Sequence, residues 1–512
     1  MVATGILLSR LTGLVTNRLL AKYMGISMAL DVYRAAFRVP NMMQNLLGEG
    51  VLSASFIPVY ARLRAEGRDR EASELAEAIF ALLALVAAVV VVSGIVAAPL
   101  LVTILAPGFH GEKRELATAL VRIVFPGTGL LVFSAWCLGV LNSHRKFFLS
   151  YAAPVVMNFT LITALLWKGG HARLGTVPLS YVVSWASVVG ALLQFGVQLP
   201  WVLRILRPLT GKIDLRSGHV RSVITAFVPV FISRGVFQIS GFIDLLLASF
   251  LPSGNALLNY AQTLYMLPVS LFGMSVSAAE LPAMSSALGT DSEIAATLRS
   301  RLARGLQQIA YFVVPSAVAF LLLGNVIAAT IYQTGKFVTR DSLFVWAALA
   351  GSGVGLLAQT MGRLFSSTFY ALRDTRTPLR FALVRVVLTL VLGFLFAIPL
   401  PRLLHIDMNW GVAGLTSSAG IAGWVEFTLL RRALQKRIGH VEFPAARVLR
   451  LWAAALIAGL AGLAIEHFAP IHRPVIVGII VLAPYGAIYL LATQLLGVGT
   501  GAEAIVRRFK RG

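Results

Sequence analysis

The chain has 512 residues, of which 58% are hydrophobic and only 13% charged. Soluble domains are about half apolar and a quarter charged, so this composition excludes an ordinary soluble protein. The formal net charge of +23 would suggest nucleic acid in a soluble chain, but here Lys and Arg beside membrane helices account for it and no nucleic-acid partner is expected.

Long apolar stretches recur from one end of the chain to the other, each able to cross a hydrocarbon core of roughly 30 Å. They predict an all-α polytopic membrane protein with about fourteen transmembrane helices. The first stretch carries Arg10 and Arg18 and lacks a small-residue cleavage site, so it is expected to be a helix and not a signal peptide. The predicted spans are 2–24, 28–60, 76–104, 115–141, 150–168, 176–203, 221–251, 255–287, 303–332, 341–371, 378–400, 409–433, 447–468 and 474–497.

Loop charge predicts the orientation of these helices. With the N-terminus inside, alternate loops hold most of the Lys and Arg, including Arg62 and Arg68, Arg204 and Arg207, and the basic tail that ends at Arg511. Because cytoplasmic loops are enriched in cations, both termini are expected in the cytoplasm, with the chain in the inner membrane.

A repeat at one fixed offset predicts the domain organisation. Ser9-Arg10 recurs as Ser233-Arg234, and Ser53-Ala54 with Pro58 recurs as Ser277-Ala278 with Pro282, always 224 residues later. Six helices separate the copies, so both copies have the same orientation, as in parallel-repeat transporters. We therefore expect six-helix bundles over 1–208 and 219–440, followed by two further helices and a basic tail over 445–512.

Motifs of catalysis are absent from the sequence. It contains no G-x-x-x-x-G-K-[ST] phosphate loop, no H-E-x-x-H, no G-x-S-x-G and no Cys or His cluster at ligand spacing. The single cysteine, Cys137, lies in an apolar stretch. We expect neither an enzyme nor a cofactor or metal site.

Charged residues inside the predicted helices are the main functional signal, because each is costly in hydrocarbon unless it faces a cavity or a partner. Cations in a wet cavity between the two bundles would pair with diphosphate or carboxylate groups. Asp31, Arg34 and Arg38 follow i, i+3, i+7 spacing and share a helix face. The predicted substrate-binding residues are Arg10, Arg18, Asp31, Arg34, Arg38, Arg234 and Arg363.

Other interpretations of these charges stay open. Arg18, Arg38 and Arg385 have the length to snorkel to the membrane interface. Asp31 could pair with a nearby arginine, or serve as a first-turn carboxylate of its helix.

Helix-breaking residues inside the predicted spans form a second signal. Such breaks persist in a membrane only where protein or cavity water satisfies the freed backbone groups. They are either hinges for alternating access or packing kinks. The predicted hinge residues are Pro40, Gly48, Gly50, Pro268 and Gly273.

Several long motifs resemble the MurJ (MviN) family of lipid II flippases. The motifs include Asp31-Val-Tyr-Arg-Ala-Ala-Phe-Arg-Val-Pro-Asn41 and the shorter Gly335-Lys-Phe337. The most specific are Gly48-Glu-Gly-Val-Leu-Ser-Ala-Ser-Phe-Ile-Pro58 and Phe369-Tyr-Ala-Leu-Arg-Asp-Thr-Arg-Thr-Pro378. The resemblance implies the multidrug/oligosaccharidyl-lipid/polysaccharide exporter fold, with a groove for a polyprenyl tail at the two C-terminal helices. It also implies translocation of undecaprenyl-linked peptidoglycan precursor, driven by membrane potential or ion gradients, and partners in cell-wall synthesis and anionic lipid. Arg10 and Asp31 match a cavity arginine and an aspartate of the family.

The chain departs from the family pattern at several cavity charges. Thr16 stands near a usual second arginine, and Ala261-Gln-Thr-Leu-Tyr-Met-Leu-Pro268 replaces an Ala-Asp-Arg-Leu-x-Glu-x-Pro pattern. Arg234 and Arg34 are hypothesised to compensate. The alternatives are another undecaprenyl-diphosphate-linked oligosaccharide, a drug/cation antiporter of the same superfamily, and a membrane-embedded glycosyltransferase or scaffold.

Overall fold

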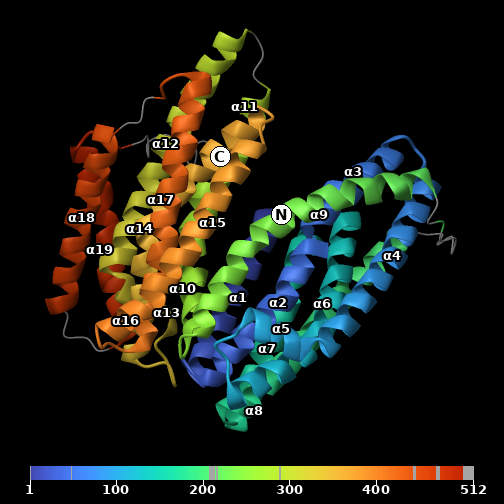
Figure 1. Ribbon diagram of the computed structural model, residues 1–512, viewed down its shortest axis with the longest axis horizontal. Helices are drawn as coiled ribbons and strands as arrows, with labels where there is room; N and C mark the ends of the chain where they lie inside the picture. Colours follow the sequence, from blue (N-terminus) through green and yellow to red (C-terminus); the bar gives the residue numbers. More distant parts are fainter. Residues whose placement is uncertain are drawn as a thin grey trace. The chain divides into compact units, whose positions relative to one another are not determined.

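The computed structural model describes residues 2–47, 49–206, 214, 217–286, 290–441, 445–468 and 473–499. Every regular element in these ranges is a helix (Figure 1), which confirms the predicted all-α fold. Within the same ranges, ten helices are long and apolar enough to cross a membrane, so the chain is a multi-pass membrane protein. Helix α1, with Arg10 and Arg18 in its apolar stretch, is not among the ten, and the predicted count of fourteen stays a prediction.

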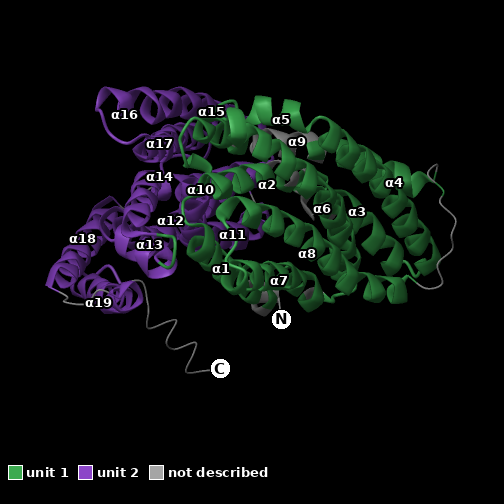
Figure 2. Ribbon diagram, turned by 90° about the horizontal axis from the view of Figure 1, so that it is seen from below, with its two compact units in different colours: residues 1–256, 334–337 green, residues 257–333, 338–512 purple. Residues whose placement is uncertain are grey.

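The helices form two compact units, drawn in green and purple in Figure 2. Unit 1 comprises residues 1–256 and 334–337, and unit 2 comprises 257–333 and 338–512. These units reflect packing, whereas the predicted bundles rest on the sequence repeat. The predicted boundaries at 208, 219 and 440 therefore stay a prediction.

Unit 1 is built around α6, which packs against α2, α4 and α8, while α1 packs on α7 and α3 packs on α9. Its helices are α1 (Val2–Met24), α2 (Met28–Leu47), α3 (Glu49–Ala65), α4 (Asp69–Val96), α5 (Ala98–Leu105), α6 (Gly111–Ser143), α7 (Phe147–Ala164), the π-helix η1 (Leu165–His171), α8 (Thr176–Ile205) and α9 (Gly218–Ser249).

Unit 2 is built around α14, which packs against α12 and α17, with α15 on α17 and α18 against α12 and α19. Its helices are α10 (Gly254–Pro268), whose first turn belongs to unit 1, the π-helix η2 (Val269–Met274), α11 (Ser275–Ser285), α12 (Asp291–Leu322), α13 (Gly324–Tyr332), α14 (Thr339–Ala371), α15 (Arg376–Ala397), α16 (Pro399–Leu403), the 3₁₀ helix η3 (Met408–Trp410), α17 (Gly411–Ile438), α18 (Ala445–Phe468) and α19 (Pro474–Leu495).

Each predicted span overlaps a helix, but some single spans are divided. The span 76–104 breaks at Ala97 into α4 and α5, and the span 378–400 breaks at Ile398 into α15 and α16. A proline lies in the first turn of each second helix, Pro99 in α5 and Pro399 in α16. Proline lacks the N–H that would continue the preceding helix but fits a new first turn, which explains both breaks.

Some buried polar side chains form hydrogen bonds with each other across neighbouring helices of one unit. Between α6 and α8, Gln194 Nε2 donates to Ser134 Oγ at 2.9 Å, and Ser134 Oγ donates to Gln198 Oε1 at 2.7 Å. Unit 1 also gathers the short segment Thr334–Phe337, because Lys336 N donates to Lys22 O at 2.9 Å. Gly335 has a φ of 58°, a left-handed conformation that favours glycine and accounts for the Gly335-Lys-Phe337 motif.

Candidate functional site

Asp31, in the first turn of α2, is fully buried and forms an ion pair. Its Oδ2 lies 2.7 Å from Lys113 Nζ at the start of α6, and its Oδ1 accepts from Ala256 N at 2.9 Å in the first turn of α10. Lys113 Nζ also donates to Pro252 O at 2.9 Å. The carboxylate therefore ties α2 to the beginnings of α6 and α10. Asp31 thus pairs with Lys113, a lysine from a distant part of the chain, and not with a nearby arginine as considered from the sequence.

Arg34, one turn further along α2, faces α1. Its Nη2 donates to Asn17 Oδ1, and the Asn17 amide is itself oriented, since Nδ2 donates to Gly13 O at 3.1 Å. The guanidinium carbon lies 5.9 Å from the centre of the Tyr33 ring, whose hydroxyl lies 3.1 Å from Ser187 Oγ on α8. The guanidinium is thus positioned between α1 and α2 with a neutral amide as one of its partners.

Arg38 is the third member of the i, i+3, i+7 set. Its Nη2 lies 3.7 Å from Asp244 Oδ2 on α9, and about a quarter of each side chain is exposed. Arg38 therefore has an acidic partner on a neighbouring helix, while its snorkelling to the interface stays a prediction. Although the three residues share a face of α2, each has a partner from a different helix, and the structure does not gather them into one cluster.

The remaining predicted substrate-binding residues lie apart from this set. Arg10 is exposed and Arg18 half-buried on α1, and Arg363 is exposed on α14 of unit 2. Beside Arg10, Asn158 of α7 donates to Ser9 O at 3.3 Å and to Thr12 Oγ1 at 3.1 Å, which fixes that turn of α1. Arg234 belongs to α9, but its side chain lies outside the described residues.

Unit 2 contains a large apolar groove of about 260 Å³. It lies among α10, α12, α13 and α19, and its lining includes Leu264, Pro268, Pro315, Phe320, Ile331 and Tyr485. The Tyr485 hydroxyl donates to Pro315 O at 2.6 Å, so it presents little free polarity to the groove. A groove of this lining suits a hydrocarbon chain.

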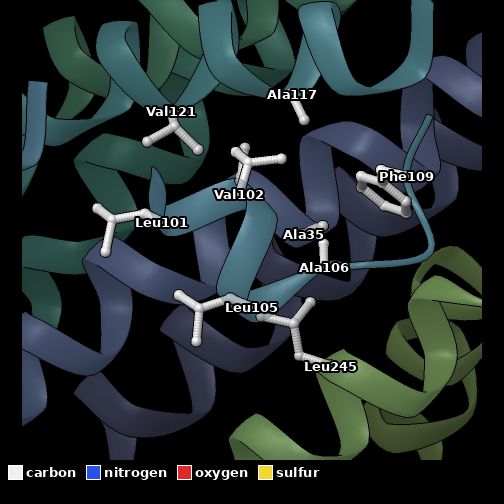
Figure 3. Close-up of a pocket in the computed structure, with 10 residues that line it drawn as sticks. Ala35, Leu101, Val102, Leu105, Ala106, Phe109, Ala117, Val121 and Leu245 are labelled. Carbon is white, nitrogen blue, oxygen red and sulfur yellow. The ribbon is translucent and has the colours of Figure 1, made fainter. Parts of the chain in front are cut away.

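A second apolar pocket lies in unit 1, among α2, α5, α6 and α9 (Figure 3). Ala35, Val102, Phe109, Val121 and Leu245 are among the side chains that line it. Its void of about 10 Å³ is at the lower limit for a single water molecule. We therefore assign it to imperfect packing of α5 and not to a ligand.

Two of the predicted hinge residues lie where the helix changes from α-helical to π-helical geometry. Pro268 ends α10, and the π-helix η2 that follows contains Gly273. A Cβ on Gly273 would lie 2.9 Å from Thr360 Cγ2 of α14, so close packing by itself accounts for this glycine. Gly48 and the side-chain surroundings of Pro40 and Gly50 lie outside the described residues.

Comparison with known proteins places the chain in a family. The family model described as "Lipid II flippase MurJ" matches residues 20–484. The chain belongs to the MurJ family. The resemblance that the sequence motifs indicate is thereby confirmed.

Individual relatives agree with this assignment. A lipid II flippase MurJ of Burkholderia cenocepacia is 33% identical over 439 residues, which cover 84% of this chain and 82% of the relative. A probable lipid II flippase MurJ of Rhizobium tropici is 28% identical over 523 residues, covering 98% and 94%.

Solved structures show the same fold. A lipid II flippase MurJ in an inward closed conformation matches with a TM-score of 0.77 at 23% identity, over 97% of this chain and 99% of that one. An inward-facing multidrug resistance MATE family transporter of the MOP superfamily matches with a TM-score of 0.63 at 16% identity, over 84% and 95%.

One departure from the MurJ pattern is now explained locally. Thr263 stands where the family pattern has an arginine, and its hydroxyl donates to Asn259 O of its own helix at 2.9 Å. Two residues on, the Tyr265 hydroxyl donates to Gln359 Oε1 of α14 at 2.7 Å. The positive charge of the family pattern is replaced here by neutral groups that bond within unit 2.

Sequence reasoning missed Glu426 of α17, which lies 3.3 Å from Arg385 of α15 through Oε2 and Nη1. Arg385 therefore has an acidic partner on a neighbouring helix, and its snorkelling to the interface stays a prediction. An acid inside the apolar span 409–433 was the signal that could have revealed it. The partnerships of Asn17 with Arg34 and of Lys113 with Asp31 join different helices and have no signature in sequence spacing.

Proposed function

We propose that this chain translocates lipid II, the lipid-linked peptidoglycan precursor, from the inner to the outer leaflet of the bacterial cytoplasmic membrane. The observation that carries the proposal is the match of the MurJ family model from residue 20 to residue 484, which spans nearly the whole chain. We further propose that transport proceeds by alternating access. The wet chamber that the sequence predicts between its two halves stays a prediction.

Cations at membrane depth are proposed to hold the anionic diphosphate. Arg34 is the strongest candidate within unit 1, because Asn17 and the Tyr33 ring position its guanidinium, whose planar fork matches phosphate oxygens. Arg10 and Arg18 on α1 and Arg363 on α14 are proposed to contribute further positive charge. Arg38 forms an ion pair with Asp244, so we propose that Arg38 binds substrate only when that ion pair opens.

Asp31 is proposed to act by positioning and not by direct contact in this conformation. Its two carboxylate oxygens are engaged by Lys113 and Ala256 N, and its side chain is fully buried. It therefore orders the start of α10 relative to α2 and α6 within unit 1. The apolar groove of unit 2 is proposed to accept part of the polyprenyl chain, which has the same chemistry as the groove lining.

The topology is proposed from loop charge, with both termini in the cytoplasm. A cysteine-labelling experiment tests it on a Cys137→Ser background, since Cys137 is the only cysteine of the chain. An impermeant thiol reagent added outside intact cells should label Glu112→Cys but not Arg70→Cys. Labelling of Arg70→Cys alone would reverse the proposed orientation.

A complementation experiment tests the function. The chain is expressed in a bacterium whose own lipid II flippase can be switched off, and lipid-linked intermediates on the inner leaflet are quantified. Growth without accumulation of lipid II supports the proposal, whereas rescue of a different undecaprenyl-linked oligosaccharide defect alone would favour that substrate. Arg34→Ala and Arg234→Ala should abolish rescue, while the control Arg221→Ala, an exposed position on α9, should leave it intact.

A further inference from the structure

An ion pair joins the middle of α15 to the middle of α17 in unit 2. Arg385 Nη1 lies 3.3 Å from Glu426 Oε2, with 28% of the arginine side chain and 14% of the glutamate side chain exposed. Both residues lie within long helices, Arg376–Ala397 and Gly411–Ile438. Charges at such positions are costly, are usually paired, and commonly mark a functional site.

A second arginine adds charge to the same place. Arg363 of α14 is exposed and lies one turn after Gln359, whose side chain packs against Gly423 of α17, one turn before Glu426. Two guanidinium groups and one carboxylate give these three side chains a sum of +1. A positive excess inside a membrane is stabilised by an anion.

Neutral side chains hold the surrounding helices in register. Gln359, one turn before Arg363 on α14, accepts from Tyr265 of α10 at 2.7 Å and donates to Ala419 O of α17 at 3.4 Å. A Cβ on Gly423 of α17 would lie 2.9 Å from the Gln359 side chain, so the contact between α14 and α17 is close. The helix that carries Arg363 is thus fixed against the helix that carries Glu426.

We propose that Arg363 and Arg385 form an anion-binding site in unit 2 for a phosphate-bearing group, with Glu426 as a built-in competitor for Arg385. Arginine has five N–H donors in a planar fork that matches phosphate oxygens. Its contact with Glu426 joins Nη1 to one carboxylate oxygen, and the other donors suit a second acceptor. An incoming phosphate replaces Glu426 at Arg385 and neutralises the positive excess.

We assign the phosphate to the diphosphate of the lipid-linked substrate, and this assignment rests on the proposed function. A phospholipid headgroup offers the same chemistry. The probe is a soluble short-chain prenyl diphosphate, and its affinity is measured by calorimetry on the full chain in detergent micelles. A parallel measurement in nanodiscs compares phosphatidylglycerol with phosphatidylcholine.

The expected result is a change of affinity in opposite directions. Glu426→Gln should bind the prenyl diphosphate at least fivefold more tightly, because Arg385 loses its internal partner. Arg363→Gln should bind it at least fivefold more weakly, as should the double variant Arg385→Gln/Glu426→Gln, which leaves no unpaired acid behind. Arg380→Gln, an exposed cation on the same α15, is the matched control and should not change the affinity.

The outcomes separate this inference from the proposed function. Unchanged affinity in Glu426→Gln, with a wild-type chain that rescues growth, overturns the site and leaves the flippase function standing. The expected affinity pattern in a chain that fails to rescue growth supports the site and overturns the function. Competition by phosphatidylglycerol that abolishes prenyl diphosphate binding overturns the assignment to substrate. A gel-filtration profile and melting curve for each variant exclude misfolding as the cause.

Discussion

Removing Lys113 should destabilise unit 1 strongly, because it leaves the buried Asp31 carboxylate without a counter-ion. At the 2.7 Å separation of the two charged atoms, the Coulomb attraction is on the order of 6 kcal/mol for an effective dielectric constant of about 20. Desolvation of both groups offsets much of this, yet breaking one side of a buried pair costs about 3–5 kcal/mol. Lys113→Met keeps the aliphatic stem and removes the charge.

The assay is a melting curve of the purified full chain in detergent micelles. A loss of that size corresponds to a drop in Tm of order 10 °C, by the scaling of a few degrees per kcal/mol. Asp31→Asn should lower the free energy of unfolding by less, about 1–2 kcal/mol, because the asparagine side-chain oxygen still accepts from Ala256 N. The Lys113 side chain is 15% exposed, so its charge can reach water when the acid is absent.

A double variant isolates the pair. Asp31→Asn/Lys113→Met should be more stable than Lys113→Met alone, since the unpaired buried charge is gone. Lys146→Met, an exposed lysine at the N-cap of α7, serves as the control. The reasoning is refuted if Lys113→Met has the same Tm as Lys146→Met. It is also refuted if the double variant loses more stability than the sum of the losses in the two single variants, because the ion pair would then not stabilise unit 1.

Three further predictions concern stability, each read from melting curves. Pro315 lacks the N–H that would bond to Tyr311 O, and the Tyr489 hydroxyl donates to that carbonyl at 2.6 Å instead. Tyr489→Phe should therefore lower the free energy of unfolding by about 1–3 kcal/mol. No loss of stability relative to the control Tyr181→Phe would contradict this. A Cβ on Gly420 of α17 would lie 2.9 Å from Gly355 N of α14, so Gly420→Ala should lower Tm, whereas Gly196→Ala, with open space around it, should not; equal Tm values would refute the close approach. Burial and then the charge of Arg64 lower the pKa of His144 from 6.5 to about 4. The unfolded chain then binds a proton that the folded chain does not, so Tm should fall as the pH drops from 6.5 towards 4 and level off below it; His144→Gln should flatten this slope, and an unaltered slope would count against it.

Much of the fold could be predicted from the sequence, because hydrocarbon imposes a strict length and polarity on each helix. Every predicted span overlaps a helix, and Arg10, Arg34 and Asp31 stood out because charge is costly in such spans. The divisions at Ala97 and Ile398 were missed although Pro99 and Pro399 signal them. Both spans were predicted as single helices because their apolar stretches are continuous, although a proline favours the first turn of a new helix.

The partners of the charged residues could not be predicted, because they lie on distant segments. Asp31 pairs with Lys113 and Arg38 with Asp244, and only the packing of α2 against α6 and α9 brings these side chains together. Helical spacing gives the direction in which a side chain leaves its own helix but not which helix it meets. Glu426 went unnoticed for a related reason, since its importance depends on Arg385 lying opposite.

The most direct test of the transport function is the amount of lipid II that reaches the outer leaflet when this chain is the sole flippase of a cell. An impermeant enzyme that cleaves lipid II from outside reports that fraction. We predict that cleavage product appears with the wild-type chain and is lost with Arg34→Ala at equal expression. Lipid II that stays protected from cleavage in cells with the wild-type chain, while a native flippase in the same strain exposes it, would contradict the proposed function.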